Sequence, residues 1–153
     1  MIKDFTFRLN GKTVEVSADE DASLLLVLRN DVGLNSLKTG CDGGQCYACS
    51  VLRNGIETTS CTVPVHAVDG CEIVTAEGFG ETELSRALQA AFYEEQASQC
   101  GYCIPGMMIG ANALLEQNPS PSVTQIKTGL ERHVCRCGAH ARIIAAVQRA
   151  ANE

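Results

Sequence analysis

The alternation of apolar and polar residues in the first half of the chain predicts a small β-sheet. Residues 4–9 alternate with a period of two, as half-buried strands do. The dipeptides Asn10-Gly11 and Asn54-Gly55 are typical of two-residue hairpin turns, because both of their residues tolerate positive φ. We therefore expect a mixed sheet with strands at residues 4–9, 13–16, 50–53, 56–59 and 72–74. The compact apolar run at 23–30 predicts one helix packed on this sheet, with Ser23 as its N-cap.

The apolar spacing changes to a helical period in the second half of the chain. Apolar residues there recur three and four positions apart, which predicts four helices. We place these helices at residues 81–97, 104–117, 122–132 and 139–150. Two prolines within 118–121 separate the second helix from the third, whose expected N-cap is Ser122. The change of period near residues 76–80 predicts two domains, 1–77 and 78–153.

Charge and composition narrow the classes of function. The chain has 153 residues and a formal charge of −6, and an acidic surface is a poor partner for nucleic acid or anionic membranes. No apolar run approaches the roughly 18 residues of a membrane helix, so we expect no membrane insertion. The first residues also lack the basic and apolar regions of a signal peptide. We therefore expect a cytoplasmic protein whose thiols stay free for metal, with disulfides as the alternative use of its nine cysteines.

Four of these cysteines, which we name the first quartet, are spaced like the ligands of an iron–sulfur cluster. They are Cys41, Cys46, Cys49 and Cys61. The C-x4-C-x2-C run is the plant-type ferredoxin spacing, in which four thiolates bind one [2Fe–2S] cluster. By analogy it indicates a β-grasp fold for the N-terminal sheet. Gly40, Gly43 and Gly44 would let the loop approach the sulfur atoms, so that backbone N–H groups stabilise their negative charge. In plant-type ferredoxins the fourth cysteine lies further downstream than Cys61 does here.

Four further cysteines form the second quartet, which follows a different spacing. They are Cys100, Cys103, Cys135 and Cys137. The C-x2-C pair opens one predicted helix and the C-x-C pair lies between two others, and helix N-termini favour thiolates. We expect a second cluster held between helix ends. A structural zinc site with four cysteines stays open as an alternative, although C-x-C is an unusual pair for a zinc ribbon.

The remaining histidines and the ninth cysteine carry no expected cofactor. His140 lies in C-x2-H with Cys137, which is half of a Rieske motif, but the matching C-x-H segment is missing. We therefore expect His140 to cap a turn or a helix. His66 and His133 are isolated in the sequence and receive no role. Cys71 is expected to be a buried structural thiol.

Three segments together resemble the iron–sulfur subunit of the molybdenum hydroxylases, the xanthine oxidase family. They read G-C-D-G-G-Q-C-Y-A-C-S-V at 40–51, Q-C-G-Y-C-I-P-G-M at 99–107 and H-V-C-R-C-G-A-H at 133–140. With Cys61, the resemblance extends over nearly the whole chain in the right order. It implies an α+β architecture, in which an N-terminal β-grasp, plant-type ferredoxin-like domain precedes a C-terminal four-helix bundle. Each domain would bind one [2Fe–2S] cluster.

The resemblance also implies electron transfer inside a larger oxidoreductase. A large partner subunit would bind molybdopterin, in its cytosine dinucleotide form, and carry out the substrate chemistry. Electrons would leave through this chain to an FAD-binding subunit or a cytochrome c, so the chain would hold no catalytic residue itself. Gln99 and Cys137 stand at the positions that contact the pterin in such subunits. A free-standing ferredoxin-like carrier with two clusters is the alternative.

Some positions depart from the commonest family sequence. Tyr47 stands where glycine is usual, His133 stands where asparagine often is, and residues 138–140 replace a frequent T-G-Y. The C-R-C-G-x-H form is most similar to bacterial subunits that serve N-heterocycle or aldehyde hydroxylases, including nicotinate dehydrogenase.

Overall fold

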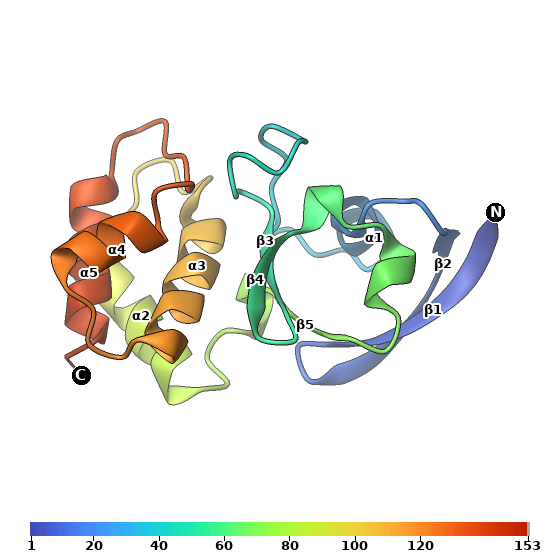
Figure 1. Ribbon diagram of the computed structural model, residues 1–153, viewed down its shortest axis with the longest axis horizontal. Coiled ribbons are helices and arrows are strands. Elements are labelled where there is room, and N and C mark those ends of the chain that lie inside the picture. The colour runs from blue at the N-terminus through green and yellow to red at the C-terminus, as the bar shows by residue number, and fades with distance from the viewer. Residues whose placement is uncertain (153) are drawn as a thin grey trace.

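The computed structural model describes residues 1–152 and places a mixed β-sheet beside a group of helices (Figure 1). The sheet has five strands in the order β2-β1-β5-β3-β4. They are β1 (Ile2–Leu9), β2 (Lys12–Asp19), β3 (Ser50–Arg53), β4 (Ile56–Thr59) and β5 (Glu72–Val74). Strand β5 pairs parallel with β1 and antiparallel with β3, which makes the sheet mixed as predicted. The N-terminal hairpin is longer at both ends than the alternation predicted.

Both predicted hairpin turns are present and have the backbone that their sequences favour. Asn10 and Gly11 have φ of 50° and 80°, and Asn54 and Gly55 have φ of 49° and 80°. Positive φ at both central residues gives a type I′ turn, whose twist matches that of the flanking strands. The turns therefore fix the register of β1 on β2 and of β3 on β4.

One helix covers one face of the sheet. Helix α1 (Leu24–Asn30) begins at the predicted cap, since the Ser23 hydroxyl accepts a hydrogen bond from the Leu26 amide. Leu24 and Leu28 are fully buried in the N-terminal core, together with Phe7 and Ile73 of the sheet. Three short 3-10 turns complete this half: η1 (Ser60–Thr62), η2 (Val65–Val68) and η3 (Ala76–Gly78).

The second half of the described chain folds into the four predicted helices. They are α2 (Glu83–Glu94), α3 (Ile104–Gln117), α4 (Val123–Gly129) and α5 (His140–Ala150). The predicted cap Ser122 begins α4 with a reciprocal capping box to Gln125. No helix within residues 1–152 is long and apolar enough to cross a membrane.

Two of the helices are shorter in the structure than the sequence predicted. Helix α2 begins only after its N-cap Thr82 and ends at Glu94, because Gln96 takes a left-handed φ of 49° that a helix cannot continue. Helix α4 ends at Gly129 instead of at residue 132. The residues after it leave the helix and pass to the first domain, where His133 becomes buried.

Helix α3 joins the two halves by packing against β3 and β4. Successive residues of β3 point to opposite faces of the sheet. Val51 therefore enters the N-terminal core, whereas Leu52 enters the helical core with Phe79 and Met107. This arrangement explains why consecutive residues of β3 are buried. It also brings the loop before β3 close to the start of α3.

Candidate iron–sulfur sites

The first quartet is assembled from one long loop and one 3-10 turn. Cys41, Cys46 and Cys49 lie on the loop between α1 and β3, and Cys61 lies in η1. The Ser60 hydroxyl donates a hydrogen bond of 2.7 Å to the Cys49 carbonyl, which holds η1 against the loop. Cys41 is exposed, whereas Cys49 is 3% exposed. The structure thus brings the four predicted ligands together at the edge of the N-terminal core.

Backbone amides around the first quartet point at sulfur, as the glycine-rich loop predicted. The Cys41 Sγ accepts N–H groups of Gly43, Gln45 and Cys46 at 3.4, 3.1 and 3.3 Å. These three donors lower the pKa of the Cys41 thiol to about 7. A Cβ on Gly40 would lie 2.4 Å from the Cys46 Sγ, so only glycine fits beside that sulfur. The loop is therefore built to stabilise thiolates before any metal contributes charge.

The pKa of the Cys61 thiol shifts in the opposite direction to that of Cys41. Burial, together with the neighbouring Cys49 thiol, raises the pKa of the Cys61 thiol to about 11. A bound ferric ion would reverse this preference, because coordination stabilises the thiolate. The quartet thus has one exposed pair, Cys41 with Cys46, and one buried pair, Cys49 with Cys61.

The second quartet lies where two turns of the helical domain meet. Cys100 and Cys103 precede α3, and Cys135 and Cys137 lie on the segment between α4 and α5. The Cys135 Sγ accepts the Ala139 amide at 3.4 Å. Burial acts to raise the pKa of Cys135, but the Ala139 amide and the Cys103 thiol outweigh it, so this pKa is lowered.

Burial also acts on the thiols of the second quartet, in the direction opposite to the helix dipole. Cys103 is the N-cap of α3, where the helix dipole should favour a thiolate. Burial and the adjacent Cys135 thiol instead raise the pKa of Cys103 to about 12. A bound cation would oppose this shift, because coordination stabilises the thiolate.

The thiols of both quartets meet in pairs, and a [2Fe–2S] cluster uses its thiolates in pairs. A zinc ion would require four sulfur atoms about 2.3 Å from one point. In residues 1–152, no three His, Cys, Asp or Glu side chains are placed around one such point. The thiols instead meet in pairs, such as Cys49 with Cys61 and Cys103 with Cys135. A [2Fe–2S] cluster, with two thiolates on each iron, requires pairs of this kind. All nine cysteines are free thiols.

The two residues predicted to contact a pterin lie side by side. The Gln99 Nε2 donates to the Cys137 carbonyl at 3.3 Å. Gln99, Ala139 and Arg142 line a shallow hollow of about 250 Å³ beside the second quartet. The amide of Gln99 is exposed, so it is accessible to a molecule bound from outside.

A set of residues between the two quartets, which we name the junction, was not anticipated. It comprises Thr39, Cys46, Tyr47, Glu57, Tyr102, Arg132, His133 and Val134. The Val134 amide donates to the Cys46 carbonyl at 3.3 Å. The Tyr102 hydroxyl donates to the Thr39 carbonyl at 2.6 Å, and Arg132 donates to the Tyr47 hydroxyl at 3.0 Å. Each quartet is thereby fastened to the loop that carries the other.

His133 is a buried residue of the junction to which the sequence analysis gave no role. It is 4% exposed, and its Nε2 lies 2.8 Å from the Glu57 Oε1 on β4. Its ring lies 5.1 Å from that of Tyr47 between centroids. Tyr47 and His133 are two of the positions that depart from the common family sequence. No local pattern in the sequence indicates that these two residues are in contact.

The other residues without an expected cofactor have structural surroundings. The His140 Nε2 lies 3.1 Å from the His133 carbonyl and spans the turn before α5, in line with the predicted turn role. His66 contacts the Glu20 carbonyl at 2.8 Å. Cys71 is only partly buried against the N-terminal core, so the expectation of a buried thiol is only partly met.

Comparison with known proteins agrees with this geometry over the full length. The 2Fe-2S iron-sulfur cluster binding domain family matches residues 7–69, and the [2Fe-2S] binding domain family matches residues 75–148. A nicotinate dehydrogenase subunit of Pseudomonas putida is 47% identical over 146 residues, covering 95% of this chain and 93% of that protein. The nicotinate dehydrogenase small FeS subunit of Eubacterium barkeri is 41% identical, covering 93% of this chain and 90% of that protein.

A solved structure supports the same conclusion. The quinoline 2-oxidoreductase structure from Pseudomonas putida contains a chain that matches with a TM-score of 0.93 and 33% identity, covering 99% of this chain and 94% of that one. The paired thiols, the β-grasp and helical domains and these matches agree with the resemblance read from the sequence. The chain belongs to the iron–sulfur subunits of the molybdenum hydroxylase family.

Proposed function

We propose that this chain passes electrons one at a time from a molybdopterin-binding partner to an outer acceptor. The ligands of its two [2Fe–2S] clusters would be the eight cysteines of the two quartets. The domain division at 77/78 would give one cluster to each domain. The observation that carries the proposal is the hydrogen bond from the Val134 amide to the Cys46 carbonyl. It supports a short route, because Cys46 belongs to the first quartet and Val134 precedes Cys135 of the second.

The order of the clusters follows from the surroundings of each quartet. Gln99 and Cys137 lie together at the second quartet, so the cluster there would face the pterin and be reduced first. Cys41 is exposed on the other domain, so the cluster at the first quartet would pass electrons to the outer acceptor. When bound, each cluster supplies one-electron redox chemistry. The chain's own part is to hold the two clusters apart at a fixed distance and to exclude water between them.

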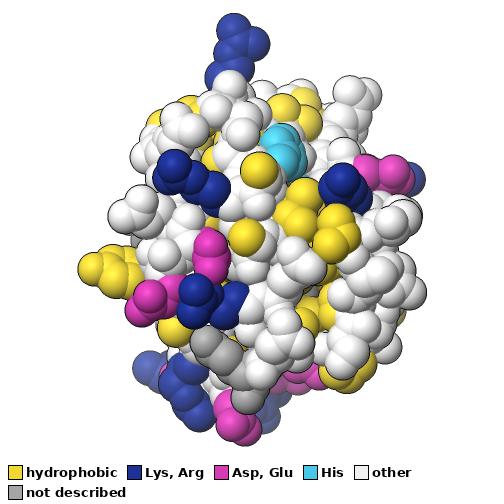
Figure 2. Space-filling view, turned by 90° about the vertical axis from the view of Figure 1, so that its left-hand side faces the viewer, with side chains coloured by type: hydrophobic (Ala, Val, Ile, Leu, Met, Phe, Trp, Pro, Cys, Tyr) yellow, Lys and Arg dark blue, Asp and Glu magenta, His cyan; other side chains and the backbone are white. Residues whose placement is uncertain are grey.

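Exposed apolar residues around the second quartet support a large partner there. Tyr102 is 49% exposed and Val134 is 59% exposed, although both lie beside cluster ligands. Figure 2 shows hydrophobic side chains in a broken band on the helical end, between separated charged groups. Surfaces of this kind are typical of protein contacts. As in the relatives named above, which are subunits, the partner would be a large subunit, with molybdopterin in its cytosine dinucleotide form. The acceptor would be an FAD-binding subunit or a cytochrome c, and the complex would be cytoplasmic.

Metal analysis and substrate reduction test this function. Anaerobically prepared protein should contain about four irons and four acid-labile sulfides per chain, and its reduced form should give two distinct EPR signals. Zinc without sulfide would reject both clusters. Isolation as a monomer that never binds a large subunit would favour the free-standing carrier instead.

The contact with the pterin is tested by Gln99→Ala in the assembled complex. Loss of the amide should leave both EPR signals unchanged, because Gln99 is not a cluster ligand. Single-turnover reduction of the clusters by substrate should slow by about tenfold, the effect of one lost hydrogen bond of about 1.4 kcal/mol at the electron donor. Unchanged reduction kinetics would refute the contact.

A further inference from the structure

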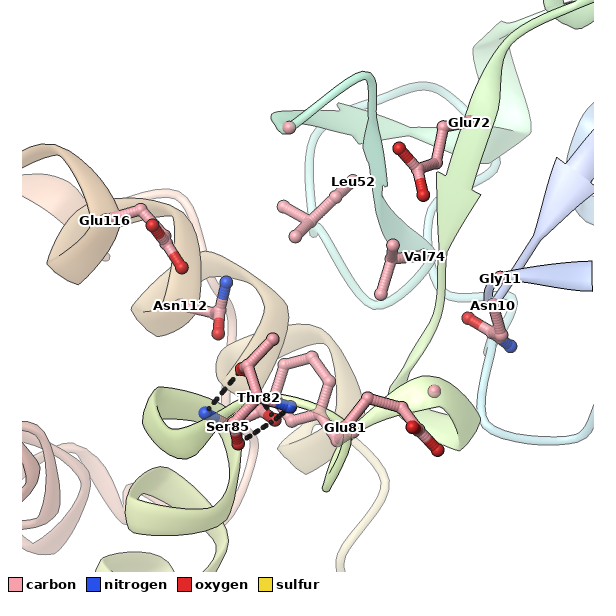
Figure 3. Close-up of a pocket in the computed structure, with 13 residues that line it drawn as sticks. Asn10, Gly11, Leu52, Glu72, Val74, Glu81, Thr82, Ser85, Asn112 and Glu116 are labelled. Atoms are coloured by element: carbon pink, nitrogen blue, oxygen red, sulfur yellow. Dashed lines mark hydrogen bonds between the residues drawn. The ribbon is translucent and has the colours of Figure 1, made fainter.

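A second concave site lies between the domains and is not used by either quartet. It is a cleft of about 440 Å³, lined by thirteen residues from the sheet and its two hairpin turns, the linker, the start of α2 and the C-terminal half of α3 (Figure 3). Its floor is apolar and includes Leu52, Val74 and Phe79. A volume of this size accommodates a few side chains of a bound molecule.

One buried polar group in the cleft has no partner within the protein. Asn112 of α3 is 6% exposed, and its side chain faces the cleft (Figure 3). In the described part of the chain, its amide makes no hydrogen bond. Its amide atoms are not among the fully buried, unpaired side-chain atoms, so they meet solvent in the cleft and are free to pair with a bound molecule. An amide offers a donor and an acceptor side by side, which matches the N–H and C=O groups of an extended peptide.

The charged residues that line the cleft are all acidic. Glu72, Glu81 and Glu116 line it, and none of its thirteen lining residues is Lys or Arg. None of these three glutamates forms an ion pair in residues 1–152. Two arginines lie near the rim, but Arg8 donates to the Gly11 carbonyl and Arg86 donates to the Gly80 carbonyl. The residues that line the cleft therefore carry only negative charge, although these two guanidinium groups stay charged beside it.

We propose that this cleft binds an extended segment of the partner subunit that carries a lysine or arginine next to an apolar side chain. The basic group would lie among the three carboxylates and the apolar side chain on Leu52, Val74 and Phe79. The Asn112 amide would pair with the backbone of the segment. This inference rests on the proposed function for the existence of a partner. It adds a second attachment point, on the opposite side of α3 from the junction.

Three single variants of the cluster-loaded chain test the proposal by affinity for the purified large subunit. Glu116→Lys reverses one charge of the cleft, and Asn112→Leu removes the amide at similar volume. Glu94→Lys is the matched control, because Glu94 is also an exposed glutamate in the last turn of a helix but lies outside the cleft. We expect Kd to rise at least tenfold for the two cleft variants and to stay within twofold for the control. Equal affinities for all three would overturn the proposal.

A photo-crosslinking residue at position 116 identifies the occupant. In the purified complex it should capture one segment of the partner that contains Lys or Arg, whereas the same residue at position 94 should not capture that segment. Capture of a second copy of this chain, or of a segment without a basic residue, would overturn the proposal. EPR separates this result from the proposed function. Clusters that substrate still reduces, with no effect of the cleft variants, would reject the cleft alone.

Discussion

His133 and Glu57 are in contact although they are 76 positions apart in the sequence, and only His133 stands in a recognised motif, the H-V-C-R-C-G-A-H segment. The two side chains are largely buried, with 3% and 17% exposure. Removing one member of a buried pair leaves the other without compensation, which is more costly than never having the pair. The energetic role of His133 is therefore to contact and cover the Glu57 carboxyl group between the two quartets.

We expect His133→Asn to lower the free energy of unfolding by about 3 kcal/mol, because Glu57 would remain buried without its partner. Adding Glu57→Gln should recover most of this loss. Urea denaturation under anaerobic conditions measures the difference. The matched control is His66→Asn, since His66 is exposed, and we expect a change of less than about 0.5 kcal/mol there. Equal losses from the single and the double variant would contradict the pairing.

Helix α3 owes its position to two glycines on one face. A Cβ on Gly106 would lie 2.4 Å from the Tyr47 carbonyl oxygen, and one on Gly110 would lie 2.3 Å from the His133 Nε2. Residues four apart share a face of a helix, so both glycines face the first domain. The close approach brings the start of α3, with Cys103, to the loop that carries the first quartet.

Gly106→Ala should destabilise the protein by about 1–3 kcal/mol, the usual cost of overpacking, although alanine favours helix. The new Cβ would meet the Tyr47 carbonyl oxygen, a backbone atom that cannot shift without distorting the loop. Gly129→Ala in α4 is the control, because its Cβ would meet only the flexible end of Leu114, at 3.1 Å. Thermal unfolding should show a lower Tm for the first variant alone. A stabilised Gly106→Ala protein would mean that α3 does not approach Tyr47.

The linker between the domains is fixed by one carboxylate. Glu77, in η3, accepts hydrogen bonds from the amides of Asn35 and Ser36 at 3.0 and 2.8 Å and from the Thr75 hydroxyl at 2.7 Å. Burial acts to raise the pKa of Glu77, but the Ser36 and Thr75 donors outweigh it and lower the pKa below its usual 4.5. The stabilisation is therefore present above about pH 4.5 and is lost only as pH falls through the lower, folded-state pKa.

We expect Glu77→Gln to cost about 1 kcal/mol, since the lost hydrogen bonds involve a charged acceptor that is partly exposed to water. The difference in unfolding free energy from the unaltered protein should stay constant between pH 8 and pH 6, because the carboxylate is ionised throughout that range. Denaturation at several pH values measures it. A difference that shrinks toward pH 6 would mean that the pKa of Glu77 is raised.

Cluster loading should be separable between the domains, because their hydrophobic cores are separate. Cys49→Ser should reduce the iron content from about four to about two per chain and remove one EPR signal, while the helical circular dichroism remains. Cys71→Ser is the matched control, because Cys71 belongs to neither quartet, and it should keep both signals. Two signals in the Cys49→Ser protein would refute the ligand assignment.

Local sequence rules predicted most of the fold, and long-range contacts account for what they missed. Asn10-Gly11, Ser23 and Ser122 each specify their structure within four residues, so the hairpin and both helix starts are where we expected them. Thiol spacing likewise predicted both quartets. The end of α2 follows from the left-handed φ of Gln96, which the apolar spacing did not indicate. The pairing of His133 with Glu57 and the raised pKa of Cys103 depend on burial by distant segments. No periodicity in the sequence reports such burial.

The hydrogen bond from the Val134 amide to the Cys46 carbonyl joins the loops of the two quartets, so the proposed route for electrons would exist only while the two domains are docked. In a newly synthesised chain, each domain would take up its cluster before the two domains dock. Either cluster would then be reducible without passing its electron to the other. Under the proposed function, electron transfer between the clusters would begin only after the two domains dock. Exchange of the Val134 amide proton, followed by NMR or mass spectrometry, would therefore report how often the hydrogen bond between the two domains opens.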